Sequence, residues 1–263
     1  MVTYSHSRIK CFENCPYQYK LKYIDKVKVD IPTTIEAFMG DLVHRALEKL
    51  YRDLGNGDSM AKESLVNYFN WLWKNEFVDE ILIVKANQGL DSETYREKGV
   101  KILERYYGLY FPFDDVEILG LETKEIVRLP DGNSWHVRID KLGKDKEGNI
   151  HVIDYKTGSR MISQMDADCD EQLAMYSFWV IENLNDYKKI ILRWKMLMHG
   201  EEIFSTRTVE ELEKLKLKII NKIRIIESTT HYPFKRSVLC NYCIYQNICP
   251  AFRKRADFWA KYL

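Results

Sequence analysis

A carboxylate and a lysine stand two residues apart in Val152-Ile153-Asp154-Tyr155-Lys156-Thr157-Gly158, after an apolar run. Because side chains alternate along a strand, Asp154 and Lys156 would point to one face and Tyr155 to the other. A carboxylate is a hard ligand for Mg²⁺ or Mn²⁺, and a nearby ammonium can orient an attacking water or stabilise charge on a phosphate. The pair suits phosphodiester hydrolysis, although the same spacing is common on ordinary edge strands.

A second acid, Asp140, follows Val137-Arg138-Ile139 in the strand predicted just before the Asp154 strand. Aspartate is disfavoured within a strand, so its presence at this position suggests that its carboxylate binds something. A hairpin of the two strands would bring Asp140 beside Asp154 and form a two-carboxylate metal site. The alternative is a solvent-facing position on the strand.

Three further polar residues lie on predicted helices. His44 flanks an apolar helical stripe, where a lone histidine is more often a packing residue than a ligand. Gln172 and Tyr176 are one turn apart and share a helix face, so that together they could hold a phosphate or Lys156.

The pattern of apolar residues predicts the elements that position these side chains. Helices are expected over residues 5–24 with a break near Cys15-Pro16, and over 35–54, 60–86, 92–109, 168–183 and 209–228, with a short terminal helix. Strands are expected over residues 116–129, 134–143, 150–156, 190–198 and 202–208, the first three as a meander. This order favours an α/β fold with a mixed central β-sheet flanked by helices and a helical N-terminal region.

Length and composition are those of an ordinary globular protein, with 263 residues, 46% hydrophobic and 30% charged. We expect one domain over residues 1–263, with a mainly helical part (1–115), a sheet core (116–208) and a C-terminal helix with a cysteine cluster (209–263). No run of about 18 apolar residues predicts a membrane span. The N-terminus lacks the apolar region of a secretory signal, so we expect a cytoplasmic protein.

Basic residues concentrate at the two ends of the chain, although its net charge is only +1. Residues 1–28 carry six Lys/Arg against two acids, and residues 231–263 carry six against one. If the ends meet, they form one basic, aromatic-rich patch that could neutralise phosphates. The alternative is two separate solvated faces.

Clustered cysteines in a reducing cytosol indicate a metal site rather than disulfides. Cys240, Cys243 and Cys249 supply three thiolates, and a four-coordinate site needs a fourth, for which Cys15 is the candidate. The spacing alone does not separate an iron–sulfur cluster from zinc. Cys11 and Cys169 have no place in this scheme and are expected to be buried, although Cys11 lies one helical turn from Cys15.

In chain order, the motifs Gly40-x-x-x-His44, Ile139-Asp140, Ile153-Asp154-Tyr155-Lys156-Thr157-Gly158 and Gln172-Leu173-x-x-Tyr176 resemble the RecB/AddB branch of the PD-(D/E)XK nucleases, including its CRISPR-associated exonucleases. The opening Ser5-x-Ser7-Arg8-Ile9-x-x-Phe12-x-x-Cys15-Pro16-x-x-Tyr19 is similar to the start of AddB-type nuclease domains. The resemblance runs from Ser5 to Cys249. One departure is Val137, near which the family often has glycine.

The resemblance implies a restriction-endonuclease-like core with particular site residues. His44, Asp140, Asp154 and the Tyr155 carbonyl would bind Mg²⁺ or Mn²⁺, with Lys156 as the catalytic lysine. Gln172 and Tyr176 would support the site and contact DNA, and Glu122 falls where some members carry an acid. Cys15, Cys240, Cys243 and Cys249 would hold a 4Fe–4S cluster that staples the first helices to the last segment, with zinc as the less favoured occupant.

The activity that the resemblance implies is a metal-dependent DNA exonuclease acting on single-stranded DNA or DNA ends, in recombination, repair, replication or CRISPR adaptation. The alternative is a DNA-binding partner of a helicase or recombination complex with little cleavage of its own. The chain has no P-loop, so it supplies no motor itself. A third possibility is a zinc-stabilised protein with an incidental D-x-K.

Overall fold

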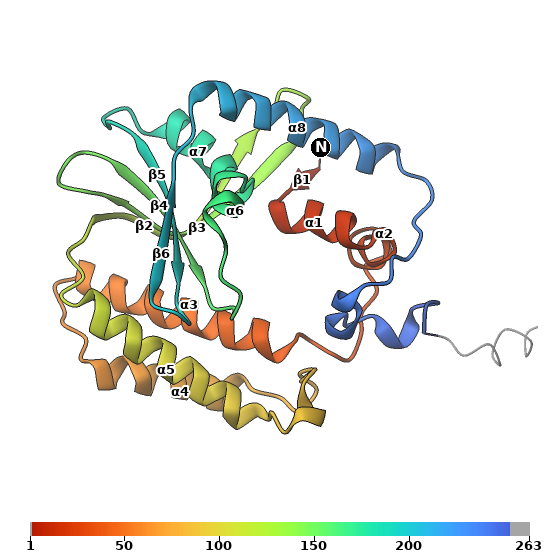
Figure 1. Cartoon of the computed structure of the whole chain (residues 1–263), viewed down its shortest axis with the longest axis horizontal. Helices are drawn as coiled ribbons and strands as arrows, with labels where there is room; N and C mark the ends of the chain where they lie inside the picture. Colours follow the sequence, from red (N-terminus) through yellow and green to blue (C-terminus); the bar gives the residue numbers. More distant parts are fainter. Residues whose placement is uncertain (1, 253–263) are drawn as a thin grey trace, which may run out of the picture.

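A computed structural model describes residues 2–252 of the protein. A six-stranded mixed sheet forms its centre (Figure 1). The strand order is β1-β3-β4-β5-β6, and β2 pairs with β3. The β2–β3, β3–β4 and β5–β6 pairs are antiparallel, whereas β1–β3 and β4–β5 are parallel. The strands are β1 (Thr3–Tyr4), β2 (Glu117–Arg128), β3 (Ser134–Lys144), β4 (Ile150–Lys156), β5 (Ile190–Met196) and β6 (Glu201–Ser205). The predicted mixed sheet and its meander are confirmed.

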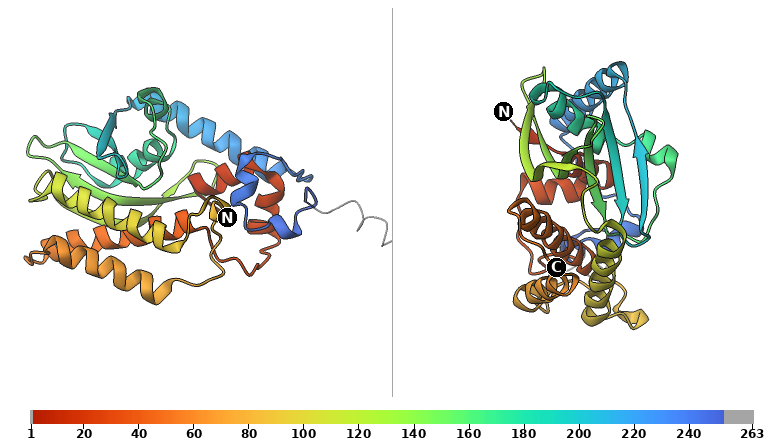
Figure 2. Two further views of the ribbon diagram at one scale, coloured as in Figure 1. Left: turned by 60° about the horizontal axis from the view of Figure 1, so that its bottom comes forward. Right: turned by 90° about the vertical axis from the view of Figure 1, so that its left-hand side faces the viewer.

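Helices cover both faces of this sheet (Figures 1 and 2). On one face α3 (Ile35–Gly55), α4 (Lys62–Glu76) and α5 (Ser92–Tyr110) enclose a core. On the other, α1 (His6–Asn14), α7 (Gln172–Asn183) and α8 (Val209–Ser228) enclose a second core. The shorter elements are α2 (Pro16–Tyr19), η1 (Lys20–Ile24), η2 (Ala86–Gln88), α6 (Gln164–Asp168), η3 (Val238–Tyr242) and η4 (Gln246–Ile248). Because side chains alternate between the two faces of a strand, Val152 of β4 packs in the core under α1, α7 and α8, and Ile153 packs in the core under α3, α4 and α5.

The ladder between β3 and β4 ends just before the two predicted acids. It runs from the Lys144–Ile150 pair to the Lys141–Ile153 pair. On the edge of β3 that faced β4, the next strand is β1, which pairs with β3 at Ser134 and Trp135. The strands therefore separate at Asp140 and Asp154, and a polar site can form between them.

Two predicted helices are shorter than expected. The helix predicted over residues 60–86 ends at Glu76, because the following segment turns to hydrogen-bond Leu82 N–H to the Thr33 carbonyl. The helix predicted over 168–183 is divided, because the Asp170 carboxylate accepts the Leu173 N–H at the start of α7. Cys169 lies in this break and is exposed, so the prediction that it is buried is wrong.

The N-terminal helices α1 and α2 lie beside the described segment that follows α8, as Figure 2 shows. The Tyr17 N–H donates to the Pro233 carbonyl at 3.2 Å, and Lys222 forms a 2.7 Å ion pair with Glu13. The predicted terminal helix and the basic residues Arg253, Lys254, Arg255 and Lys261 lie outside the described residues. Among the helices of residues 2–252, none is both long and apolar enough to span a membrane.

Candidate active site

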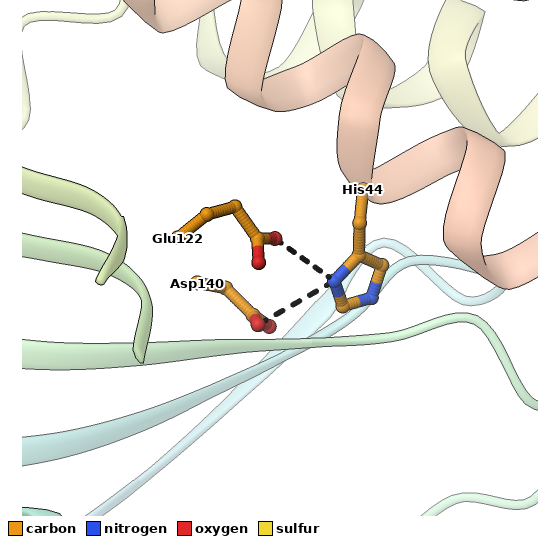
Figure 3. Close-up of side chains that lie close together, drawn as sticks. All are labelled: His44, Glu122 and Asp140. Atoms are coloured by element: carbon orange, nitrogen blue, oxygen red, sulfur yellow. Dashed lines mark ion pairs between the residues drawn. The ribbon is translucent and has the colours of Figure 1, made fainter. Parts of the chain in front are cut away.

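Three side chains from three elements converge where β3 and β4 separate (Figure 3). His44 on α3 places Nδ1 3.4 Å from an Asp140 oxygen and 3.5 Å from a Glu122 oxygen. Their ligand atoms all lie within 4.8 Å of one another, close enough to surround one metal ion. The oxygen-rich donor set fits a hard divalent cation such as Mg²⁺ or Mn²⁺.

Glu122 joins this group through an unusual backbone conformation. Its φ is +44°, in the left-handed region that residues other than glycine rarely adopt. Its side chain is only 8% exposed, and its second oxygen accepts a 2.7 Å hydrogen bond from Arg138 Nε. Backbone strain of this kind is held by surrounding structure and occurs at functional sites.

The Asp154–Lys156 pair lies beside the trio. The two charged groups are 2.7 Å apart, as expected for alternate residues on one face of β4. The Gln172 amide joins the pair to α7, because it donates to Asp154 at 3.3 Å and to the Tyr176 hydroxyl at 3.1 Å. Lys156 Nζ in turn donates to the Gln172 carbonyl oxygen at 3.4 Å.

The backbone of Tyr155 ties the acids and the histidine together. Its N–H donates to Asp140 at 2.7 Å, in place of the ladder bond that the separated strands do not form. Its carbonyl oxygen lies 3.0 Å from His44 Nε2. The tyrosine side chain points to the other face of the sheet, where its hydroxyl lies 3.3 Å from that of Tyr106. Tyr155 thus offers the site its backbone groups, and its ring packs edge-on against the His44 ring with the centroids 5.7 Å apart.

The electrostatics of the cluster favour a cation. Burial lowers the pKa of His44, but the charge of Asp140 and hydrogen bonds to Asp140 and Glu122 outweigh it and raise that pKa to about 10. Burial raises the pKa of Asp154 to about 6, and the charge of Asp140 adds to this, against the opposing effect of Lys156. These shifts reflect a high density of negative charge in a poorly solvated site.

A cavity of about 550 Å³ opens onto these groups. Its walls come from the start of α1, from α3, from β3 and β4, and from α7. It exposes His44, Asp140, Asp154, Lys156, Gln172 and Tyr176 together. Apart from Glu122, the polar residues predicted for the catalytic site therefore face one space, large enough for part of a nucleotide chain.

The four predicted cluster cysteines lie around one cavity, where α2 approaches the turns after α8. Cys15, Cys240, Cys243 and Cys249 line a second cavity of about 30 Å³ between α2 and the C-terminal turns. Burial raises the pKa of the Cys243 thiol, and the nearby thiols Cys15, Cys249 and Cys240 add to the rise. Among residues 2–252, the Sγ atoms of these cysteines do not gather within 4.8 Å of one another as the ligand atoms of His44, Glu122 and Asp140 do. Thiolates are the ligands that zinc and iron–sulfur clusters take. Cys11 packs against the core beside them.

The sequence patterns left two residues of this site without a firm role. For Glu122 the sequence offered only a position where some family members carry an acid, although the structure places it beside His44. Arg138 had no predicted role and was named only as a neighbour of Asp140. Its spacing of two from Asp140 on a strand was the available signal that both share a face.

Comparisons with known proteins identify the family of this chain. The family model described as the PD-(D/E)XK nuclease superfamily matches residues 3–250. An ATP-dependent helicase/deoxyribonuclease subunit from three Clostridium perfringens strains is 24% identical over 274 aligned residues, which cover 86% of this chain and 23% of the relative. This chain thus spans about a quarter of that relative's length. The crystal structure of SSO0001 covers 97% of this chain and 89% of its own, at 13% identity and a TM-score of 0.38, too low to support an argument.

Proposed function

Because this chain belongs to the PD-(D/E)XK nuclease superfamily, we propose that it is a metal-dependent DNA exonuclease acting on single-stranded DNA or DNA ends. The carrying observation is that His44, Asp140 and the Asp154–Lys156 pair line one cavity, with Glu122 completing a possible metal-binding trio with His44 and Asp140. Carboxylates, imidazole and ammonium in this arrangement are the groups that phosphodiester hydrolysis needs. The preference for ends rests on the family resemblance alone.

The proposed metal ligands are His44, Asp140, Asp154 and the Tyr155 carbonyl, with Glu122 added because it lies within the same trio. When bound there, Mg²⁺ or Mn²⁺ supplies Lewis acidity toward the phosphate and lowers the pKa of a water. To bind the metal through Nδ1, which faces Asp140, His44 must lose its Nδ1 proton. To bind through Nε2, it must give up the hydrogen bond to the Tyr155 carbonyl. Asp140 keeps its position through the Tyr155 N–H.

Lys156 is proposed as the catalytic lysine. Its ammonium faces the cavity at 2.7 Å from Asp154, where it can orient the attacking water and stabilise charge on the phosphate. Gln172 fixes this pair through bonds to both partners, and Tyr176 fixes Gln172. We therefore assign Gln172 and Tyr176 to positioning the lysine and bordering the DNA.

The cysteine cavity is proposed to hold a 4Fe–4S cluster through Cys15, Cys240, Cys243 and Cys249, with zinc as the rival occupant. The group would link α2 to the C-terminal turns, and this link would keep the start of α1 against the catalytic cavity. Its proposed role is structural, and DNA binding would depend on it indirectly.

A helicase or recombination complex is the proposed partner. The name of the Clostridium perfringens relative, an ATP-dependent helicase/deoxyribonuclease subunit, supports this. CRISPR adaptation is a further setting that the family resemblance allows. The alternative function, DNA binding beside a motor without cleavage, is separated from the nuclease by assay.

The test is cleavage of end-labelled single-stranded and duplex DNA by protein purified without oxygen. Mg²⁺, Mn²⁺ and EDTA are compared for wild type, Lys156→Ala and Lys144→Ala. Lys144 is a matched control, because it is a lysine in a 2.9 Å ion pair, with Asp186, on the same sheet but outside the cavity lining.

We expect divalent-metal-dependent cutting by wild type and Lys144→Ala, and its loss in Lys156→Ala. The product ladder then gives the polarity, and iron, sulfide and zinc analysis identifies the cysteine-bound group. Tight DNA binding without cutting in either metal would reject the nuclease and favour the partner role.

A further inference from the structure

A cationic side chain that the proposed mechanism does not use shares the catalytic cavity. His136, Arg138 and Asp140 alternate along β3, and all three line that cavity. Because side chains two apart on a strand share a face, this stripe leads away from the metal trio toward the start of β3. A DNA strand that places one phosphate at the trio would pass over these residues.

Arg138 contacts one member of the trio, Glu122. Glu122 places one oxygen 3.5 Å from His44 Nδ1 and the other 2.7 Å from Arg138 Nε. A guanidinium carries five N–H donors, and this contact uses one of them. The Arg138 side chain is 46% exposed, whereas Glu122 is 8% exposed, so the guanidinium reaches from a buried acid into the cavity.

The site therefore has cations on two sides. Lys156 pairs with Asp154 on β4, and Arg138 pairs with Glu122 beside β3. The other acids lining the cavity lie on the α3 wall, where Glu36 accepts a bond from Tyr95 at 2.8 Å and Asp41 pairs with Arg45 at 3.4 Å. Arg138 is therefore the cation of the β3 wall, where the charges of Glu122, Asp140 and Asp41 act on it.

Resting on the proposed nuclease function, we propose that Arg138 binds the phosphate next to the scissile one. A planar guanidinium matches two non-bridging oxygens of a phosphate and forms charge-assisted hydrogen bonds with them. With Lys156 at the scissile phosphate, the two cations fix the register of the strand across the metal site. Arg138 would contact substrate directly, while Glu122 holds its guanidinium in place.

The rival explanation is that Arg138 only orients Glu122 for the metal. The two roles differ in what they predict. A residue that orients a metal ligand changes the concentration of metal that the reaction needs. A phosphate contact changes DNA affinity, and its effect depends on the charge of one particular phosphate.

The experiment pairs protein variants with a neutralised phosphate. Single-stranded oligonucleotides carry one methylphosphonate, either next to the cleaved bond or several nucleotides away. Binding is measured by anisotropy in Ca²⁺, and cleavage in Mn²⁺ over a range of metal concentrations. Wild type is compared with Arg138→Ala, Arg138→Lys and the control Arg96→Ala, an arginine of α5 paired with Glu93.

We expect Arg138→Ala to weaken binding about tenfold to a hundredfold, the range for a hydrogen bond to a charged group. The neighbouring methylphosphonate should weaken wild type similarly but Arg138→Ala little further, because the two changes remove one contact. The slope of log affinity against log salt should fall by about 0.7. Arg138→Lys should keep part of the affinity. Because Arg138 Nε also holds Glu122, the Mn²⁺ requirement of Arg138→Ala can rise as well, and the coupling to the methylphosphonate is what identifies the phosphate contact.

Additive losses in both the variant and the modified DNA would overturn the proposal, as would a raised Mn²⁺ requirement without any such coupling. If wild type cuts nothing, the nuclease function fails by itself. A methylphosphonate placed at each terminal linkage in turn, with binding measured in Ca²⁺, still decides whether Arg138 contacts one particular phosphate. Arg138→Lys provides the same decision if Arg138→Ala does not fold.

Discussion

Gly40 allows α3 to approach β4 closely enough for His44 to reach the site. A Cβ atom at Gly40 would lie 2.9 Å from Thr157 Oγ1 and 4.0 Å from Thr157 Cβ. His44 stands one turn further along α3 and meets the Tyr155 carbonyl of β4 at 3.0 Å. Gly40→Ala should therefore push apart the two elements that carry the proposed metal ligands.

The size of this effect follows from the distances. Ordinary contact begins at 3.4 Å, so the new methyl group and the Thr157 hydroxyl must separate by about 0.5 Å, and a helix shift of that size is near the tolerance of a catalytic site. Misplacement of about 1 Å can cost a hundredfold in rate, so we expect a loss of roughly tenfold. Alanine stabilises a helix over glycine by about 1 kcal/mol, and overpacking costs about 1–3 kcal/mol. The free energy of unfolding should therefore fall by no more than about 2 kcal/mol.

The assay is the initial cleavage rate as a function of Mn²⁺ concentration, with urea unfolding measured in parallel. Gly40→Ala should cut more slowly and need more Mn²⁺, while remaining folded. Thr157→Ala removes the clashing oxygen, so Gly40→Ala/Thr157→Ala should recover activity relative to Gly40→Ala, with Thr157→Ala alone as the reference. Full activity of Gly40→Ala, or no recovery in the double variant, would refute the role of this close approach.

Three further predictions concern Glu122, the cysteines and the ion pairs of Asp115. Glu122→Gln should raise the Mn²⁺ concentration for half-maximal cleavage at least about tenfold, and an unchanged metal titration would remove Glu122 from the ligand set. Cys240→Ser should lose bound iron and lower Tm, whereas the exposed Cys169→Ser should change neither; equal iron content in both would contradict the assignment. The charges of Lys141, Lys195 and Arg193 outweigh burial and hold the pKa of Asp115 well below its usual range. This carboxylate therefore stabilises the fold above its unfolded pKa of about 4, and stability is lost as pH falls further; urea unfolding at pH 5 and pH 3 should show less loss for Asp115→Asn than for wild type.

Local periodicity was enough to predict most elements and one part of the site. The apolar stripe of Phe38, Leu42, Ala46 and Leu50 predicted α3, which runs over Ile35–Gly55. Two-residue alternation placed Asp154 and Lys156 on one face of β4, and the observed 2.7 Å pair agrees. These features depend on neighbours within a few residues, which the sequence displays directly.

The ends of elements depended on contacts made far along the chain. Nothing in residues 60–86 showed that the helix stops at Glu76, because the reason is a hydrogen bond between Leu82 and Thr33. Cys169 was predicted to be buried from its residue type. Its exposure follows from the break between α6 and α7, which the Asp170 carboxylate fixes.

By itself, the sequence determined the mixed α/β organisation, the acids, lysine and histidine that could do chemistry, and the cysteines that could share a site. Only the tertiary structure decided that β3 and β4 separate at Asp140, that a left-handed backbone turns Glu122 toward His44, and that Arg138 faces the same cavity. The physical reason is distance along the chain. Periodicity fixes which face of its own element a side chain takes, but strand register and helix packing fix which faces meet.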